Sequence, residues 1–230
     1  MNARWWPLIA ILVVGGLAWG GFIQLGAQGV MMSGMAMGPA MLALMWVVMM
    51  VAMMVPAAAP SYLMYSRMAP QRWHSGFYLT GYLAVWAGIG LLYAGVQWAL
   101  RRSGFMAPDL TLAQPVAAGV LLIVAGLWQW SPWKGRCVAR CRSPLGFLLN
   151  EWQAGSRGAL LMGLRYAGWC VGCCWLLMAV LFVAGTMSFV AALAIAAYIL
   201  LERLLPLGRP LDRVVGAGLA VWGGWLLVAA

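Results

Sequence analysis

The chain has 230 residues, of which 65% are hydrophobic and only 8% are charged, and its mean hydropathy is +0.92. So apolar a composition excludes a soluble domain and indicates a polytopic membrane protein that lies in the lipid bilayer. The net charge of +10 comes from basic residues between the apolar segments. This distribution favours control of membrane orientation and contact with lipid head groups, and it argues against nucleic acid as a partner.

Apolar segments of helical length follow one another along the whole chain. We expect an all-α bundle of about seven transmembrane helices, with six as the alternative, in a single integral membrane domain over residues 1–230. The expected spans cover about residues 7–26, 39–59, 76–98, 115–130, 166–186, 188–205 and 214–228, with an interfacial helix at about 145–157. Whether residues 145–168 span, re-enter or lie at the interface is left open by this pattern.

Basic residues favour one side of this topology. If the N-terminus is cytoplasmic, Lys134 and most arginines fall inside, whereas Arg101 and Arg102 fall outside. The positive-inside rule therefore predicts a cytoplasmic N-terminus and an external C-terminus. The first apolar segment is interpreted as a retained span and not as a cleavable signal peptide.

The most informative stretch is Trp-Cys-Val-Gly-Cys-Cys-Trp at residues 169–175. On a helix, Cys170, Cys173 and Cys174 share one face, and Met178 extends this strip by one turn. Gly172 removes a side chain beside the thiols, so that another backbone or a ligand could approach closely. Soft thiolates at this spacing suit Cu(I), or zinc as the second candidate.

A second pair, Cys137 and Cys141, lies in a basic segment at residues 131–144 that we expect to be a loop. A single free cysteine is usually a small hydrophobic packing residue. Five cysteines in two clusters favour metal or redox chemistry instead. Both clusters fall on the expected cytoplasmic side, where a reducing environment disfavours structural disulfides.

Methionines and one carboxylate add further candidate ligands. Met50, Met53 and Met54 are expected at the cytoplasmic end of the second span, where neutral thioethers could bind Cu(I) weakly. Methionine also packs well in irregular cores, so packing is the alternative role. Glu202 closes the sixth span on the same side, and an ionisable residue in a membrane span is a candidate functional group. Its alternative role is a salt bridge with Arg203 or Arg165, or snorkelling to the interface.

Three segments carry a family resemblance: residues 46–56, with paired methionines before Pro56; residues 129–144, with Cys-x3-Cys-Arg-Ser-Pro; and residues 168–178, with Gly-Cys-Cys-Trp. Over about residues 35–205 the chain resembles the bacterial family of predicted metal-binding integral membrane proteins (domain of unknown function 2182). Glu202-Arg203 resembles its closing motif, in which Glu-Lys is more usual. The resemblance implies a multi-span helical protein of the bacterial inner membrane that binds a metal, with copper handling often suggested, and it implies no catalysed reaction.

Three classes of function remain open. The favoured hypothesis is a membrane protein that binds copper as Cu(I) for transport, chaperoning or delivery to a cuproprotein or another membrane subunit. Its expected metal ligands are Cys137, Cys141, Cys170, Cys173, Cys174, Met50, Met53, Met54, Met178 and Glu202. The alternatives are a membrane oxidoreductase that depends on metal or thiols, and a structural or assembly subunit of a larger membrane complex. No catalytic residue is indicated, and the absence of a nucleotide-binding motif excludes nucleotide-driven pumping by this chain alone.

Overall fold

The computed structural model describes residues 6–31, 38–107, 111–186, 188–205 and 208–229, which fold into a helical bundle. The all-α prediction is therefore confirmed. The helices are α1 (Trp6–Met31), α2 (Pro39–Met68), α3 (Arg72–Arg102), α4 (Pro115–Gln129), α5 (Pro132–Arg142), α6 (Pro144–Asn150), α7 (Gly155–Ala179), α8 (Leu181–Ala184), α9 (Phe189–Leu204) and α10 (Gly208–Val228).

Several helices begin with a proline residue. It occupies the first turn of α2, α4, α5 and α6, where its fixed φ suits the helix and its missing N–H is not needed. In α5 the hydroxyl of Ser131 also caps the helix by accepting a hydrogen bond from the backbone N–H of Trp133. Residues 132–142 therefore form a helix and not the expected loop, because both a proline and a capping serine begin it.

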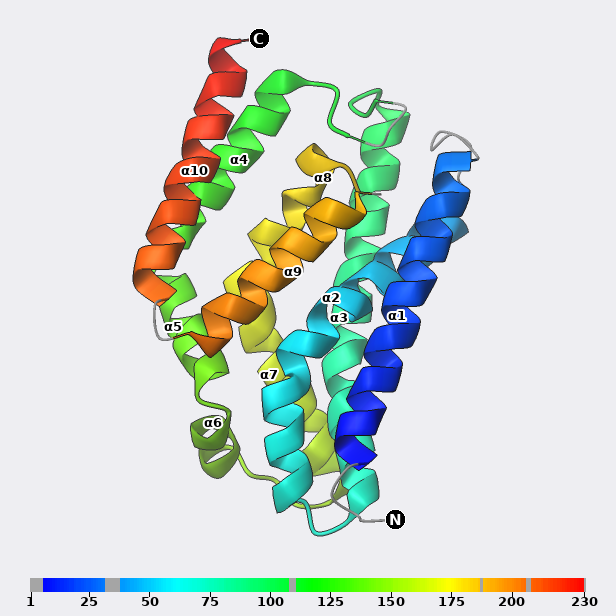
Figure 1. The fold of residues 1–230 in the computed structure, drawn as a ribbon, viewed down its shortest axis with the longest axis vertical. Coiled ribbons are helices and arrows are strands. Elements are labelled where there is room, and N and C mark those ends of the chain that lie inside the picture. The colour runs from blue at the N-terminus through cyan, green and yellow to red at the C-terminus, as the bar shows by residue number, and fades with distance from the viewer. Residues whose placement is uncertain (1–5, 32–37, 108–110, 187, 206–207, 230) are drawn as a thin grey trace.

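Helices α2, α3 and α7 form the centre of the bundle (Figure 1). The buried share of the most apolar stretch is 56% in α2 and 61% in the segment of α7, whereas it is 11% in α1 and 17% in α10. Helix α1 packs on the outside of α2, α4 pairs with α10, and α9 crosses obliquely between these two groups. The side chains in the middle of α2 and α7 therefore face the interior.

Among the described residues, five helical segments are long and apolar enough to span a membrane, and six if α4 and α5, which meet at a bend of 61°, form one broken span. The seven predicted membrane spans are therefore not found among the described residues, and the alternative prediction of six spans is the upper limit. Helix α9 has 16 residues and so measures about 24 Å, which is short of the ~30 Å hydrocarbon core.

Two helices extend well beyond their predicted bounds. Helix α2 continues through Pro56 and Pro60 to Met68, because neighbouring helices make prolines tolerable inside a membrane helix. Helix α7 begins at Gly155 instead of residue 166, and the expected interfacial helix shrinks to α6. The cysteines of α7 and the paired methionines of α2 consequently lie within their helices and not at helix ends.

Helices α3 and α7 approach each other closely at glycine. A Cβ atom on Gly81 would lie 2.3 Å from the carbonyl oxygen of Leu160, and one on Gly163 would lie 2.1 Å from that of Tyr78. Small residues at such crossings let two membrane helices pack backbone to backbone. This contact brings Tyr82, which follows Gly81, over the cysteine-bearing face of α7.

Candidate functional site

The three cysteines of α7 share the inward face of that helix, as the sequence predicts. Cys170, Cys173 and Cys174 are each at most 1% exposed. The thiols of Cys173 and Cys174 donate to the carbonyl oxygen of Cys170, each over 3.0 Å. All five cysteines of the chain are free, so the thiols are available as ligands.

Helix α5 brings the second cysteine pair against α7. Cys141 is 4% exposed and lies in the same buried core as the α7 cysteines. The Cys137 sulfur lies over Gly172, only 2.8 Å from the position that a Cβ atom would occupy there. Gly172 thus leaves room beside the thiols as expected, and the group that fills this room is the sulfur of a fifth cysteine instead of another backbone or a ligand.

Two tyrosines fix this arrangement. The Tyr82 hydroxyl lies 3.0 Å from the Cys170 sulfur and 3.4 Å from the carbonyl oxygen of Met54 on α2. The Tyr166 hydroxyl donates to the carbonyl oxygen of Cys141 over 3.0 Å, which ties α5 to α7. Four helices, α2, α3, α5 and α7, therefore converge on the thiols.

A positive charge lies inside the same cluster. Arg203 of α9 is only 8% exposed, and its guanidinium donates to the Cys170 sulfur at 2.5 Å and reaches the Cys173 sulfur at 3.5 Å. The same group donates to the carbonyl oxygen of Ala57 on α2 over 3.0 Å. A buried guanidinium requires partners that compensate its charge, and here two sulfur atoms and a carbonyl oxygen surround it.

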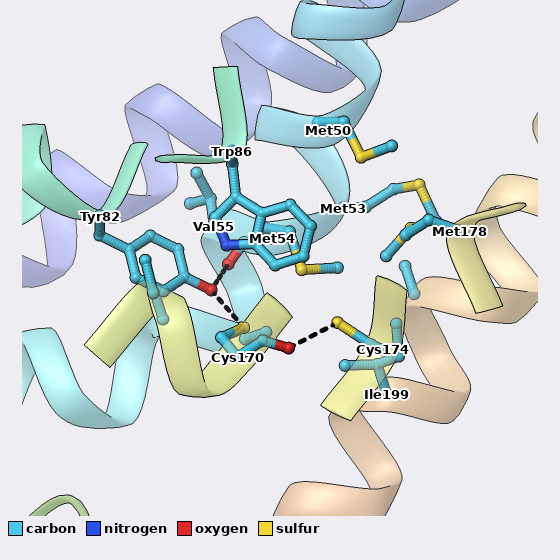
Figure 2. Close-up of a cluster of buried hydrophobic side chains, with 14 of the residues drawn as sticks. Met50, Met53, Met54, Val55, Tyr82, Trp86, Cys170, Cys174, Met178 and Ile199 are labelled. Carbon is cyan, nitrogen blue, oxygen red and sulfur yellow. Dashed lines mark hydrogen bonds between the residues drawn. The ribbon is translucent and has the colours of Figure 1, made fainter. Parts of the chain in front are cut away.

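Thioethers adjoin the thiols on the side of α2. Figure 2 shows the side chains of Met50, Met53, Met54 and Met178 gathered beside Cys170 and Cys174 in the buried core. All four methionines are at most 1% exposed. The structure therefore brings together the sulfur residues that the sequence singled out, in the middle of the helices and not at an end of the second span. The methionines at 32–37 lie outside the described residues.

Glu202 belongs to a different cluster. Its carboxylate forms a 2.5 Å ion pair with Lys134 of α5, which also pairs with Asp212 of α10 at 3.2 Å. Tyr198 donates to Asp212 over 2.8 Å. Glu202 therefore forms its salt bridge with Lys134 and not with Arg203 or Arg165. Because successive residues on a helix point about 100° apart, the adjacent Glu202 and Arg203 face different neighbours. Arg203 reaches the sulfurs, and Glu202 faces α5 and α10.

Sequence reasoning missed Arg203, Tyr82 and Lys134 as parts of these clusters. The positive-inside rule groups Arg203 with the other arginines of the cytoplasmic side, although a charged pair at 202–203 inside an apolar segment is itself the sign of a functional group. The partners of a buried charge come from other helices and are set by packing. For Lys134, no signal in its basic neighbourhood distinguishes it from Arg136 or Arg140.

The cluster offers soft donors beside a fixed positive charge. Within the described ranges, no three His, Cys, Asp or Glu side chains are arranged so that they could hold a metal ion by themselves. The α7 thiols instead contact the carbonyl oxygen of Cys170, the Tyr82 hydroxyl and Arg203. The donor set nevertheless fits a soft monovalent ion, which accepts thiolates and thioethers and needs fewer ligands than a tetrahedral zinc site.

Comparison with known proteins gives one match. A family model described as PpoB2, copper chaperone, matches residues 43–226, a range that includes all five cysteines, the buried methionines and Arg203. No curated protein and no solved structure matches the chain. This description supports copper as the metal that the sequence resemblance suggests. The matching family has a different name from the one to which the sequence was compared. Because the match covers most of its length, the chain belongs to the PpoB2 family of copper chaperones.

Proposed function

We propose that this protein binds Cu(I) inside the membrane and delivers it to a copper-requiring partner protein. The observation that carries the proposal is the buried sulfur cluster, in which thiols of α5 and α7 and thioethers of α2 lie in one core and two of the α7 sulfurs contact Arg203. The description of its family as copper chaperones supports the same metal. It also favours delivery over the oxidoreductase and the assembly subunit considered above.

The charges in the cluster support Cu(I) over zinc. A Cu(I) ion held by two thiolates carries a net charge of −1, which the Arg203 guanidinium balances in the apolar core. Cys170 and Cys173, which both contact that guanidinium, are the proposed thiolate pair, and Cys141 adjoins Cys173. Thioethers bind Cu(I) without adding charge, so Met54 and Met178 can serve as weaker ligands during exchange.

The proposed mechanism is ligand exchange along the sulfur atoms. Because the thioethers of α2 and the thiols of α7 adjoin in the core, the ion can pass between weak and strong sites without entering a solvated state. Delivery then requires a partner with a stronger sulfur or histidine site. We place the protein in the bacterial inner membrane with a cytoplasmic N-terminus, as the basic residues indicate.

Elemental analysis of the purified, detergent-solubilised protein after exposure to Cu(I) tests this function. We expect stoichiometric copper in the wild type and its loss in a variant with Cys141→Ser, Cys170→Ser and Cys173→Ser. A matched control, Met68→Leu, changes a methionine at the far end of α2 and should keep the metal. Stoichiometric copper in the triple variant would contradict the assignment. Zinc found in place of copper in the wild type would also contradict it.

A further inference from the structure

Cys137 is the accessible member of the cysteine set. The other four cysteines are at most 4% exposed, whereas Cys137 is partly exposed and borders two surface cavities of about 590 and 430 Å³. A metal ion that approaches from this surface therefore meets the thiol of Cys137 before any other sulfur of the cluster.

The position of Cys137 connects this surface to the buried thiols. Its sulfur lies against the α7 backbone at Gly172, one residue before Cys173. Cys141 follows one turn later on α5 and lies in the same buried core as Cys173. An ion bound at Cys137 thus has a buried sulfur as its next neighbour.

The larger cavity has aromatic walls and positive charge. Trp133, Arg136, Ala139, Arg140 and Trp169 line it together with Cys137, and this lining contains no acidic residue. The guanidinium of Arg136 lies 5.3 Å from the ring of Trp133, and that of Arg140 lies 5.0 Å from the ring of Trp169. An arginine stacked on an aromatic ring is held flat, while its N–H groups can still donate to a carboxylate.

The charge balance around Cys137 is also positive. Arg136, Arg140 and Arg165 carry three positive charges on the two cavities, and Glu151 carries the only negative one, so the net charge of these lining residues is +2. Glu151 pairs with Arg140 at 3.6 Å and with Arg165 at 3.4 Å. Both arginines are half-exposed in these pairs, which are weak and exchangeable in water.

We propose that this cavity receives a small anionic thiol compound that carries Cu(I), and that Cys137 takes the ion from it. The inference rests on the proposed function and names the donor for the same site. A volume of about 590 Å³ lies within the range of small-molecule pockets. The arginines match carboxylates of the carrier, and the two tryptophans pack against its apolar part.

The transfer is a ligand exchange without electron transfer. The Cys137 sulfur forms a bond to Cu(I) as one bond between the ion and a carrier sulfur breaks. The proton of the Cys137 thiol passes to the departing carrier thiolate, which leaves as a thiol, and the ion stays Cu(I) throughout. Two further exchanges of the same kind move the ion to Cys141 and Cys173: the Cys141 thiol gives its proton to the second carrier sulfur as that sulfur leaves, and the Cys173 thiol gives its proton to the Cys137 thiolate as the bond between Cys137 and the ion breaks.

Copper-loading rates of the full-length protein in detergent test the proposal with two donors: the anionic complex of Cu(I) with glutathione, and the cationic complex of Cu(I) with acetonitrile. For a double variant, Arg136→Gln with Arg140→Gln, we divide the loading rate from the anionic complex by the loading rate from the cationic complex. This ratio should fall about tenfold relative to the wild type, because electrostatic steering of the anionic complex is lost. The charge-preserving pair Arg136→Lys with Arg140→Lys should keep most of the ratio. Arg67→Gln, which removes an exposed charge outside the cavity, serves as the control.

Cys137→Ser should slow loading from both donors, because the first sulfur is missing. An unchanged rate ratio in the glutamine pair would overturn the anionic carrier, and an unchanged rate in Cys137→Ser would overturn the role of the thiol. Either result leaves the proposed function standing if the wild type still binds copper. A wild type that takes no copper from either donor would refute the proposed function itself. Circular dichroism confirms that each variant keeps its helices.

Discussion

The guanidinium of Arg203 on α9 lies 2.5 Å from the sulfur of Cys170 on α7. Both side chains are buried, and Arg203 is also anchored to the carbonyl oxygen of Ala57 on α2. Three helices are thus joined at one charged contact in the apolar interior. The positive charge is therefore as much a part of the buried cluster as the sulfurs are, and in the proposed function it balances the charge of the bound metal complex.

Removing this charge should weaken Cu(I) binding. We expect Arg203→Gln to lower the affinity about 100-fold, which corresponds to about 2.8 kcal/mol, because a bis-thiolate complex then lies in the core with an unbalanced negative charge. Arg203→Lys should lose less, since it keeps the charge but not the planar guanidinium. Competition with a chromophoric Cu(I) chelator measures both affinities.

Arg157→Gln is the matched control, because it removes one positive charge from an exposed residue at the start of α7. Its affinity should stay within about twofold of the wild type, since exposed charges are screened by water and salt. Equal affinities for Arg203→Gln and the wild type would show that the guanidinium does not balance the metal complex.

The cysteines of α7 should contribute unequally. The thiols of Cys173 and Cys174 both donate to the carbonyl oxygen of Cys170, but the contacts of the Arg203 guanidinium are with the sulfurs of Cys170 and Cys173. We therefore expect Cys170→Ser or Cys173→Ser to lower the Cu(I) affinity more than Cys174→Ser does, by at least about tenfold. Single serine variants titrated against the same chelator give the order. An equal loss in all three would indicate a shared three-thiolate site.

The sequence alone predicts the class of the fold and the content of the site, but not its position. The composition and the spacing of Cys170, Cys173 and Cys174 suffice for a helical membrane bundle with one sulfur face, because helical periodicity is a local property. The start of α7 at Gly155 was missed because Arg157 and Arg165 resembled a boundary in a hydropathy window. Side chains of this length reach the surface from a continuing helix.

Contacts between helices lie beyond what the sequence predicts. The sequence predicts Glu202 as a metal ligand and Arg203 as a cytoplasmic residue. In the structure, Arg203 contacts the sulfurs and Glu202 forms an ion pair with Lys134. The two residues are adjacent, so a small rotation of α9 decides which one faces α7. That rotation depends on the packing of α9 against α2, α5 and α10, which no single segment encodes.

The Lys134 cluster should hold α5, α9 and α10 together. Lys134 is fully buried between Glu202 and Asp212, so Lys134→Met leaves two carboxylates without a cation. We expect this change to destabilise the protein by about 3–5 kcal/mol, as for other broken buried pairs. Thermal unfolding in detergent, followed by circular dichroism, should show a markedly lower midpoint.

The control for that change is Glu151→Gln, which removes a carboxylate from two half-exposed ion pairs on the surface. Such pairs contribute about 0–1 kcal/mol, so the midpoint should hardly move. If Lys134→Met unfolds at the same temperature as Glu151→Gln, the buried cluster does not stabilise the bundle.

Gly172 should matter for copper loading more than for stability. A Cβ atom there would lie 2.8 Å from the Cys137 sulfur, the mobile end of a side chain, so Gly172→Ala displaces the thiol without breaking the fold. We expect loading from the glutathione complex to slow severalfold, while alanine changes helix stability by ~1 kcal/mol at most. Gly88→Ala, on α3 with open space around it, should load normally. Equal rates for the two alanine variants would separate the close contact at Gly172 from metal transfer, since both changes add the same methyl group to a long helix of the bundle.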